Sequence, residues 1–573
     1  MRLSTAQRAL ALGPVALWAA MAWRARWVCD DAFIDLVVVR NLLAGHGPLL
    51  NAGERVEVFS NPLWVAVLTV LGAVVPGDPA RTLPWLAVAL GLTLSLVGLA
   101  APSLAAARRA HPTEMRDLAL PLGGLVVVAL APFHDFATSG LETGMSFAWL
   151  GLTWTLVDPR DPRPPRTLRR HAAVAVLTGL GVLVRPDLAV FALALTALHL
   201  SDDPARTRKR VALGALAALA LPALWQLFRM AWYASLVANT ALAKEATLTR
   251  WDQGWRYLAD FNAPYALWVP VLALVGLTGL STRRAWRAYT LSVAALVHAL
   301  GVMRLGGDFM HARMLLPSLF ALCLPVLLTR GGARRGLAVV LPWAALTLYG
   351  AVAHPRVPTV RAGIVDERAY YVAASGVANP ITLYDFTATS WYQGATTLRQ
   401  MAASRRLLVL AGSTTPEGRI RHGLTIPALL PDLPQRVVAA NAIALGIMTF
   451  AAGPTVAVRD LHGLADPLGA RIQLLRRGRP GHEKDLAPAW VVARYGDFDS
   501  AAMPPALRDH PAVQAARRTL RCGPVAELVA ATTAPWTVAR ALRNLRVAWS
   551  LTRLRVPADP RAAARALCPP GAP

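Results

Sequence analysis

The chain has 573 residues, of which 55% are hydrophobic and only 16% are charged. A soluble globular protein carries about 25% charged residues, so this composition is typical of a membrane protein. The formal net charge is +26, from 59 Lys and Arg against 33 Asp and Glu. Much of this positive charge lies in short loops between apolar segments, where it sets membrane topology, so we expect no nucleic-acid partner.

About eleven apolar segments are predicted to cross the membrane. The first covers residues 9–27, and because no small-residue cleavage site follows it, we interpret it as an uncleaved helix; a signal peptide is the alternative. Residues 62–75 are fewer than the roughly 20 of a full span, so we expect a juxtamembrane helix there. The other predicted spans lie at about residues 83–105, 118–133, 141–157, 170–184, 187–200, 210–230, 264–281, 287–303, 313–329 and 336–353.

Arginine-rich loops decide the predicted topology. They lie at residues 108–116, 160–170, 206–210, 283–287 and 330–335. If residues 62–75 do not cross the membrane, all these loops fall on the cytoplasmic side, as the positive-inside rule requires. We therefore expect a multi-pass protein of the cell membrane with a cytoplasmic N-terminus. Its transmembrane catalytic domain would cover residues 1–353 with a first outer loop at 28–61, and an extracytoplasmic domain would cover 354–573.

The C-terminal domain is expected to mix helices and strands. The apolar runs at residues 406–410 and 490–495 are predicted strands, and residues 511–553 are predicted to be helical. Cys522 and Cys568 lie in this domain, where an extracytoplasmic location would allow them to form a disulfide. Two unrelated thiols are the alternative.

Two adjacent carboxylates, Asp30 and Asp31, directly follow the first apolar segment on its outer side. Acidic groups are costly at such a position, so they call for a function. A carboxylate there can deprotonate an acceptor hydroxyl, or it can hold a divalent cation beside a phosphate. The structural alternative is a cap for the helix that begins near Ala32, but one Asp would suffice for that.

Further polar side chains on the same predicted face are candidates for substrate binding. Arg185, Lys244 and Arg313 are suited to a phosphate group. The structural alternatives are an Arg185–Asp187 pair, an Asp308–Arg313 pair and a lysine anchored at the membrane interface. The full set of candidates is Glu57, Asn61, Glu142, Arg185, Asn239, Lys244, Asp308, His311 and Arg313.

The nucleotide-binding signatures that a soluble sugar donor would need are not found in the sequence. A site on the outer face has no nucleotide supply, so a group donor must arrive in the lipid, and a polyprenyl-phosphate sugar is the natural candidate. Short motifs at the start of the chain resemble those of the GT-C membrane glycosyltransferases. They are Asp30–Ile34, Asn41–Gly47, Gly53–Glu57 and Ser60–Trp64.

Within that class, the chain is similar to the actinobacterial family of terminal β-(1→2)-arabinofuranosyltransferases. The motifs that carry this narrower likeness are Ser139–Thr143, Asn239–Thr240, Gly306–Met310, Gly363–Ala369, Asp460–Gly469 and Arg477–Lys484. The resemblance implies a GT-C fold with a catalytic Asp pair at Asp30 and Asp31. It also implies a decaprenyl-phosphoryl-arabinose donor and a cell-wall arabinan acceptor. For the extracytoplasmic domain at residues 354–573 we expect a role in binding the acceptor or another carbohydrate.

Two other functions stay open at this point. A GT-C transferase could use another polyprenyl-phosphate sugar, such as mannose. A transporter of a polyprenyl-linked glycan is the third hypothesis, but a transporter should show two matching halves with broken helices. We find no such halves, and the candidate polar groups all lie on one predicted face, so the enzyme is favoured.

Overall fold

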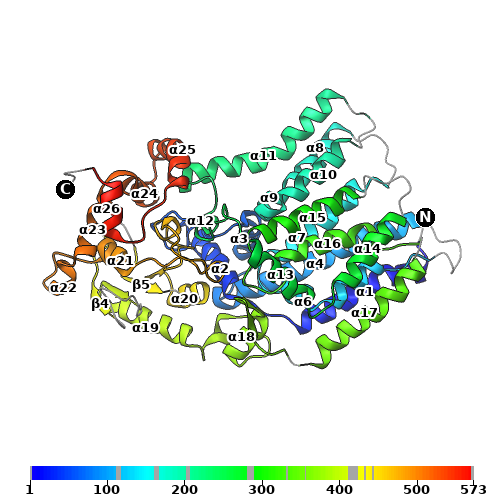
Figure 1. Cartoon of the computed structure of the whole chain (residues 1–573), viewed down its shortest axis with the longest axis horizontal. Coiled ribbons are helices and arrows are strands. Elements are labelled where there is room, and N and C mark those ends of the chain that lie inside the picture. The colour runs from blue at the N-terminus through cyan, green and yellow to red at the C-terminus, as the bar shows by residue number, and fades with distance from the viewer. Residues whose placement is uncertain are drawn as a thin grey trace.

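The computed structural model describes residues 3–110, 118–160, 167–201, 205, 207–280, 289–330, 333–354, 356–410, 424–430, 434–441 and 444–569. Among these residues, helices make up the N-terminal part, and a small sheet surrounded by helices makes up the C-terminal part (Figure 1). The N-terminus lies at the end of the helix bundle farthest from that sheet (Figure 1).

Every predicted apolar segment coincides with one or more helices, although several are broken. The helices of this part are α1 (Thr5–Arg24), α2 (Asp30–Leu43), α3 (Pro62–Val74), α4 (Pro79–Ala110), α5 (Leu122–Ala129), α6 (Ala131–Phe136), α7 (Thr143–Val157), α8 (Leu168–Gly179), α9 (Gly181–Val184), α10 (Ala189–Ser201), α11 (Arg208–Tyr233), α12 (Asn239–Ala243), α13 (Trp251–Asn262), α14 (Trp268–Leu280), α15 (Tyr289–Arg304), α16 (Leu316–Cys323) and α17 (Ala333–Ala353). The segment at 118–133 divides into α5 and α6, because Leu130 is extended and Pro132 follows it.

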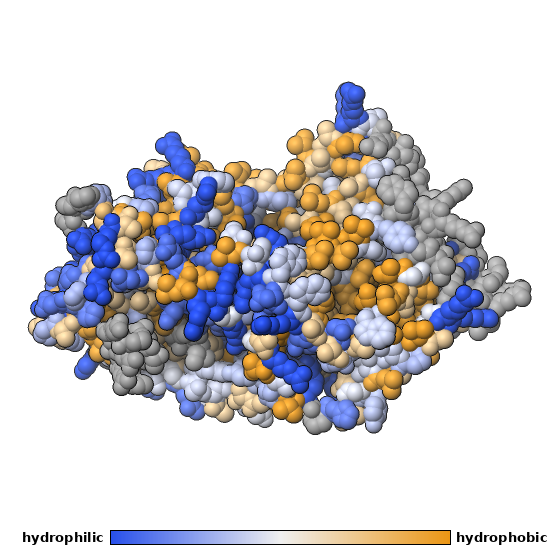
Figure 2. Space-filling model, viewed as in Figure 1, coloured by the Kyte–Doolittle hydropathy of each residue, from blue (hydrophilic) through white to orange (hydrophobic). Residues whose placement is uncertain are grey.

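Three of the described helices are long and apolar enough to cross a membrane by length and composition, namely Pro79–Ala110, Arg208–Tyr233 and Arg334–Ala353. The remaining spans of the eleven stay predictions, as do the domain boundaries. Hydrophobic side chains gather over the helix bundle, whereas the half with the C-terminal elements is mostly hydrophilic on the face shown in Figure 2. This division fits a chain that is embedded in a membrane at one end.

The C-terminal part is built on a four-stranded sheet with the order β4-β3-β5-β6. Its strands are β3 (Leu407–Leu410), β4 (Leu424–Pro427), β5 (Val437–Asn441) and β6 (Val456–Asp460), and β1 (Val360–Arg361) pairs with β2 (Ile364–Val365) in a separate hairpin. Strand β4 is antiparallel to β3, whereas β5 and β6 continue the sheet in parallel. The helices are α18 (Glu367–Ser375), α19 (Ser390–Ser404), α20 (Leu445–Ala452), α21 (Pro488–Tyr495), α22 (Pro505–Arg508), α23 (Pro511–Arg521), α24 (Gly523–Thr533), α25 (Val538–Arg553) and α26 (Pro560–Leu567).

The sequence predictions for this part are confirmed at one strand and wrong at another. Residues 407–410 form β3 as expected. Residues 490–495 lie in helix α21, because Pro488 starts a helix well and Val491 and Tyr495, four residues apart, bury one helical face. Residues 511–553 are helical in three pieces, α23, α24 and α25. Cys522 and Cys568 form a disulfide, the pairing that the sequence suggested.

Helix α20 packs closely against α2 and joins the two parts of the molecule. A side chain at Gly446 would place its Cβ 2.0 Å from the backbone oxygen of Asp30, so only glycine allows this approach. Phe33 and Phe450 meet edge to face across the contact, with ring centroids 5.7 Å apart. The start of α2, which carries both acidic candidates, is therefore buried between the helix bundle and the C-terminal part.

Candidate active site

Asp30 and Asp31 are neighbours in sequence, but their side chains have different partners. The Asp30 carboxylate accepts hydrogen bonds from the backbone N–H groups of Gly446, at 3.2 Å, and Ile447, at 2.7 Å. These groups form the first turn of α20, where an N-terminal helix dipole favours a negative charge. Burial nevertheless raises the pKa of Asp30 to about 7. Asp30 thus holds α20 onto α2.

Asp31 faces Arg313 instead. Its Oδ2 lies 3.6 Å from Nη1 of Arg313, and the side chain keeps 29% of its surface exposed. Burial raises the pKa of Asp31, and the positive charges of Arg313 and then Lys244 oppose that shift. Asp31 is therefore a carboxylate that a substrate can reach and that lies beside a fixed cation.

Arg313 is the centre of a group of charges that we call the reaction cluster: Asp31, Glu142, Arg185, Asp308 and Arg313. Nη1 of Arg313 lies 3.5 Å from Oδ2 of Asp308, and Nη2 lies 3.8 Å from Oε1 of Glu142. Arg185 donates a hydrogen bond to the same Glu142 oxygen at 3.0 Å. Asp308 is 5% exposed, and its Oδ2 is buried and accepts no hydrogen bond. This oxygen therefore has an ion-pair contact with Arg313 but no hydrogen bond, and it can exchange that contact for a substrate.

Local backbone geometry places Asp308 and Arg313 on one side of a tight loop. Gly307 has φ +74°, and a Cβ there would collide with the ring of Tyr257 at 2.3 Å. Tyr257 donates a hydrogen bond from its hydroxyl to the backbone oxygen of Met310 at 2.9 Å and accepts one from the backbone N–H of Met314 at 3.1 Å. The loop is therefore held on both sides of Arg313.

Asn61 connects the first outer loop to this cluster. Its amide donates to Asp35 at 2.7 Å and to Glu142 at 2.9 Å. Burial, followed by the nearby Glu142 charge, raises the pKa of Asp35. Asp35 was not among the predicted site residues, although its spacing of four residues from Asp31 places both on one face of a helix. Glu367 was also missed: it is buried, and burial followed by the charge of Asp31 raises its pKa. Its position within the family motif Gly363–Ala369 was the sequence signal that could have identified it.

Lys244 and Arg185 occupy the margins of the cluster. Lys244 follows α12 and approaches Gly481, where an added Cβ would lie 3.2 Å from the lysine Cε. Arg185 also pairs with Asp187, the structural alternative that the sequence left open, at 3.0 Å. Asp187 in turn lies 2.9 Å from His298. Lys244 thus offers a charge near Asp31, whereas Arg185 is already engaged by two carboxylates.

Three predicted substrate-binding residues have other partners in the structure. Glu57 forms an ion pair with Arg229 at 2.6 Å. The Asn239 amide donates to backbone oxygens of residues 463, 464 and 466 and so anchors the C-terminal part. His311 pairs with Asp260 at 2.6 Å and lines a cavity of about 830 Å³ between α13 and α17. These contacts give each residue a structural task outside the reaction cluster.

The arrangement gives little support to a divalent cation at Asp30 and Asp31. Asp30 points to the backbone of α20 and Asp31 to Arg313. Within the described residues, no group of three or more His, Cys, Asp or Glu side chains is placed to hold a metal ion. We therefore derive no chemical step through a cation.

Comparison with known proteins gives the family. Residues 416–565 match a family model described as the AftB family C-terminal domain. A terminal β-(1→2)-arabinofuranosyltransferase of Mycobacterium tuberculosis is 34% identical, with 94% of each chain covered. One of the same name from Corynebacterium glutamicum is 32% identical, covering 96% of this chain and 86% of its own. No solved structure matches the chain.

A helical membrane-type fold with a buried charged site, together with these relatives, defines a membrane glycosyltransferase. More narrowly, the chain belongs to the family of terminal β-(1→2)-arabinofuranosyltransferases. This agrees with the resemblance drawn from its motifs.

Proposed function

We propose that this enzyme transfers an arabinofuranosyl group from decaprenyl-phosphoryl-arabinose to the non-reducing ends of cell-wall arabinan and forms terminal β-(1→2) linkages. The names of the relatives supply the sugar and the linkage. The observation that best supports the chemistry is Arg313, held within 3.6 Å of both Asp31 and Asp308. A cation flanked by two carboxylates suits a reaction in which a phosphate leaves and a hydroxyl attacks.

In this proposal Arg313 stabilises the leaving phosphate. Breaking the bond between the anomeric carbon and the phosphate oxygen develops negative charge on decaprenyl phosphate. The Arg313 side chain is 12% exposed and carries a fixed positive charge that can meet the charge on the phosphate. Lys244 supplies a second positive charge near Asp31. The phosphate would displace the carboxylates from Arg313 in part, which frees Asp308 for reaction.

The donor and the product are both β in this assignment, so configuration is retained. Retention by double displacement needs a nucleophilic carboxylate in addition to a base. We assign the nucleophile to Asp308, whose Oδ2 accepts no hydrogen bond. It bonds to the anomeric carbon as decaprenyl phosphate departs. The acceptor hydroxyl then attacks that carbon, Asp31 takes the hydroxyl proton, and the Asp308 ester bond breaks.

The topology belongs to the same proposal. We place the N-terminus in the cytoplasm and the start of α2, with residues 354–573, on the outer side of the membrane. The arginine-rich loops support this orientation by the positive-inside rule. The C-terminal part would then meet the arabinan acceptor, and the donor would reach the cluster from the lipid.

The test is a donor assay with the purified full-length protein and a synthetic arabinan oligosaccharide. We expect transfer from decaprenyl-phosphoryl-arabinose and none from decaprenyl-phosphoryl-mannose, with a β-(1→2) linkage in the product by NMR. Transfer from the mannose donor alone would replace the proposal with the alternative sugar. Movement of an intact lipid-linked glycan across vesicles without transfer would favour a transporter.

A further inference from the structure

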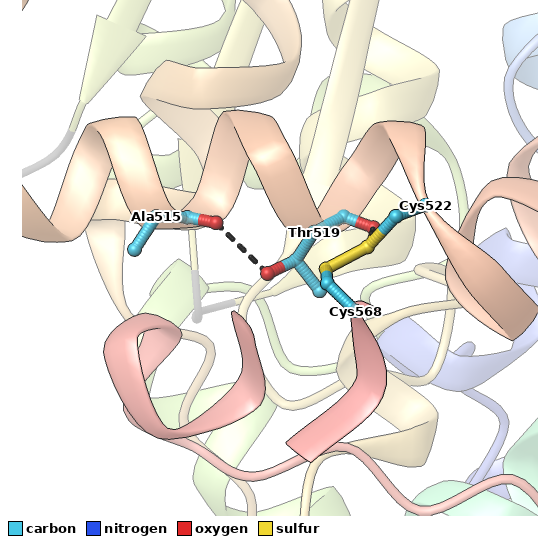
Figure 3. Close-up of a disulfide and its surroundings, with 4 residues drawn as sticks. All are labelled: Ala515, Thr519, Cys522 and Cys568. Atoms are coloured by element: carbon cyan, nitrogen blue, oxygen red, sulfur yellow. Dashed lines mark hydrogen bonds between the residues drawn. A yellow bond between two sulfur atoms is a disulfide. The ribbon is translucent and has the colours of Figure 1, made fainter. Parts of the chain in front are cut away.

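A second charged site lies at the far end of the C-terminal part, away from the helix bundle (Figure 1). Helices α23 and α26 pack side by side there and share a core that includes Val513, Ala516 and Ala563. The disulfide between Cys522 and Cys568 joins the two C-terminal ends, and Thr519 donates a hydrogen bond to Ala515 on the same helix (Figure 3). The two helices therefore keep a fixed spacing.

Arginine side chains from both helices line one cavity of about 570 Å³ between them. On α23, Gln514, Arg518 and Arg521 follow the spacing of a single helical face, and Arg517 lies beside it. Arg561 and Arg565 are four residues apart and line up on α26. We call this site the arginine groove; its lining includes Gln514, Arg517, Arg518, Arg521, Arg561 and Arg565.

The groove holds more positive charge than its neighbours balance. Arg561 meets Asp559 at 3.8 Å, but both side chains are at least half exposed. Arg517 stacks over the ring of Phe498 at 3.9 Å, and burial, followed by the charge of Arg521, lowers the pKa of Arg517 while Asp499 opposes that shift. No ion pair is found within the described residues for Arg518, Arg521 or Arg565.

Helix capping explains part of this pattern. A cation in the last turn complements a helix dipole, and Arg518, Arg521 and Arg565 each occupy a last turn. That role does not require Arg517 or Arg561, and it does not require both helices to direct their arginines into the same space. The disulfide keeps the arginines of the two helices near one another, where their positive charges repel. An anion bound between them would lower that repulsion.

We propose that the arginine groove binds an anionic glycan, a polysaccharide with carboxylate or phosphate groups spaced along its chain. Guanidinium groups bind both kinds of oxyanion in a bidentate manner. The volume suits a few sugar units, and the groove runs between two parallel-packed helices, as a chain-like ligand requires. Helices α23 and α26 lie far from the helix bundle (Figure 1), so the proposed topology puts the groove away from lipid headgroups. The choice of a glycan rests on the proposed function, which places this part among cell-wall polysaccharides.

Fluorescence anisotropy with labelled polygalacturonate oligosaccharides tests this site in the full-length protein at physiological ionic strength. We expect the Arg521→Gln, Arg565→Gln double variant to bind roughly tenfold more weakly or worse, because two charge-assisted contacts are lost. The matched control is Arg399→Gln with Arg405→Gln, which removes the same charge from exposed positions outside the groove. The control should bind like the unchanged protein.

Equal weakening in the control would overturn the proposal, since it would mean that net charge alone attracts the polymer. Tighter binding of labelled poly-glutamate than of polygalacturonate would also overturn it, in favour of an acidic protein partner. If the double variant does not fold, the Arg521→Lys, Arg565→Lys variant replaces it. This variant keeps both charges but loses the planar guanidinium groups, so it should weaken binding by a smaller factor. Unchanged binding in this variant would count against the groove. Because the readout is binding, its outcome is independent of the donor assay.

Discussion

Two buried groups of charges in this protein are paired in different ways. The reaction cluster lies at the start of α2 and has ion pairs of 3.5 to 3.8 Å around Arg313 and an exposed edge at Asp31. A second group, which we call the docking cluster, consists of Glu54, Arg459, Arg494 and Asp466. Glu54 there contacts both arginines directly.

The difference lies in what remains available to a ligand. Glu54 and Arg459 are each 1% exposed at the side chain, and together they tie the first outer loop to β6 and α21. Asp466 is held by the backbone N–H groups of Leu468, at 2.9 Å, and Gly469, at 2.7 Å. Charges in such contacts position a domain, whereas loosely paired charges at an accessible edge can exchange their partners for a substrate. The predictions below separate these two roles.

The largest effect is expected for Asp31→Asn. Removing the base that takes the acceptor proton should lower kcat by about 10² to 10⁴, while the thermal unfolding midpoint stays close to that of the unchanged protein. Steady-state transfer to an arabinan oligosaccharide, with a parallel melting curve, measures both. Normal turnover in this variant would remove Asp31 from the mechanism.

Arg313→Lys should follow, with kcat lowered about a hundredfold, because a lysine keeps the charge but loses the planar fork that reaches several oxygens. Arg229→Lys is the matched control, since Arg229 is another arginine paired with a buried carboxylate, Glu57, and it lies outside the reaction cluster. The same assay applied to both variants compares them. If Arg229→Lys loses as much turnover as Arg313→Lys, the effect at Arg313 is a general consequence of weakening a buried pair.

Glu54→Gln is expected to act on stability instead. It leaves the buried Arg459 without its counter-charge, and breaking a buried pair in this way costs about 3 to 5 kcal/mol. The melting midpoint should fall, while kcat per folded molecule should change by less than about twofold. A large drop in kcat at constant stability would place Glu54 in the chemistry and erase the contrast between the two clusters.

The smallest effect concerns the pH dependence at Asp30. Its pKa in the folded protein is about 7, against an ordinary value of 3.8, so between these pH values the folded state holds a proton that the unfolded state releases. Stability should therefore fall as pH rises from about 4 to 7. Asp30→Asn has no titrating carboxyl group at this position, so its melting midpoint should fall less than that of the unchanged protein over the same pH range. Parallel slopes in the two proteins would show that Asp30 is not the titrating group.

Much of this architecture follows from the sequence. The apolar segments all coincide with helices, because long apolar runs leave few other structures open. The prediction of a strand from the apolar run at residues 490–495 was wrong, since a short apolar run with Trp490 and Tyr495 fits a buried helix equally well. Local patterns do not distinguish these two cases.

The site was predictable in its types of residue and less so in its pairing. Asp31, Asp308 and Arg313 were identified as candidates from their position on the outer face, and the structure brings them together. The turning of Asp30 toward α20 depends on residues more than 400 positions away in the chain. A sequence motif identifies two adjacent acids as candidates, but only tertiary contacts show that they have separate partners.

The most direct test of the reaction cluster uses a small nucleophile in place of a missing carboxylate. Asp308→Gly should lose transfer, and added azide should then react with decaprenyl-phosphoryl-arabinose to give an arabinosyl azide of anomeric configuration opposite to the donor, detectable by mass spectrometry and NMR. Asp187 pairs with Arg185 but is not itself a member of the reaction cluster. The Asp187→Gly variant, which removes this carboxylate, should give no azide product. Formation of the azide only in Asp308→Gly is the result we predict. Its absence there, or equal yields in both variants, would contradict the assignment of the reaction to the Asp31, Arg313 and Asp308 group.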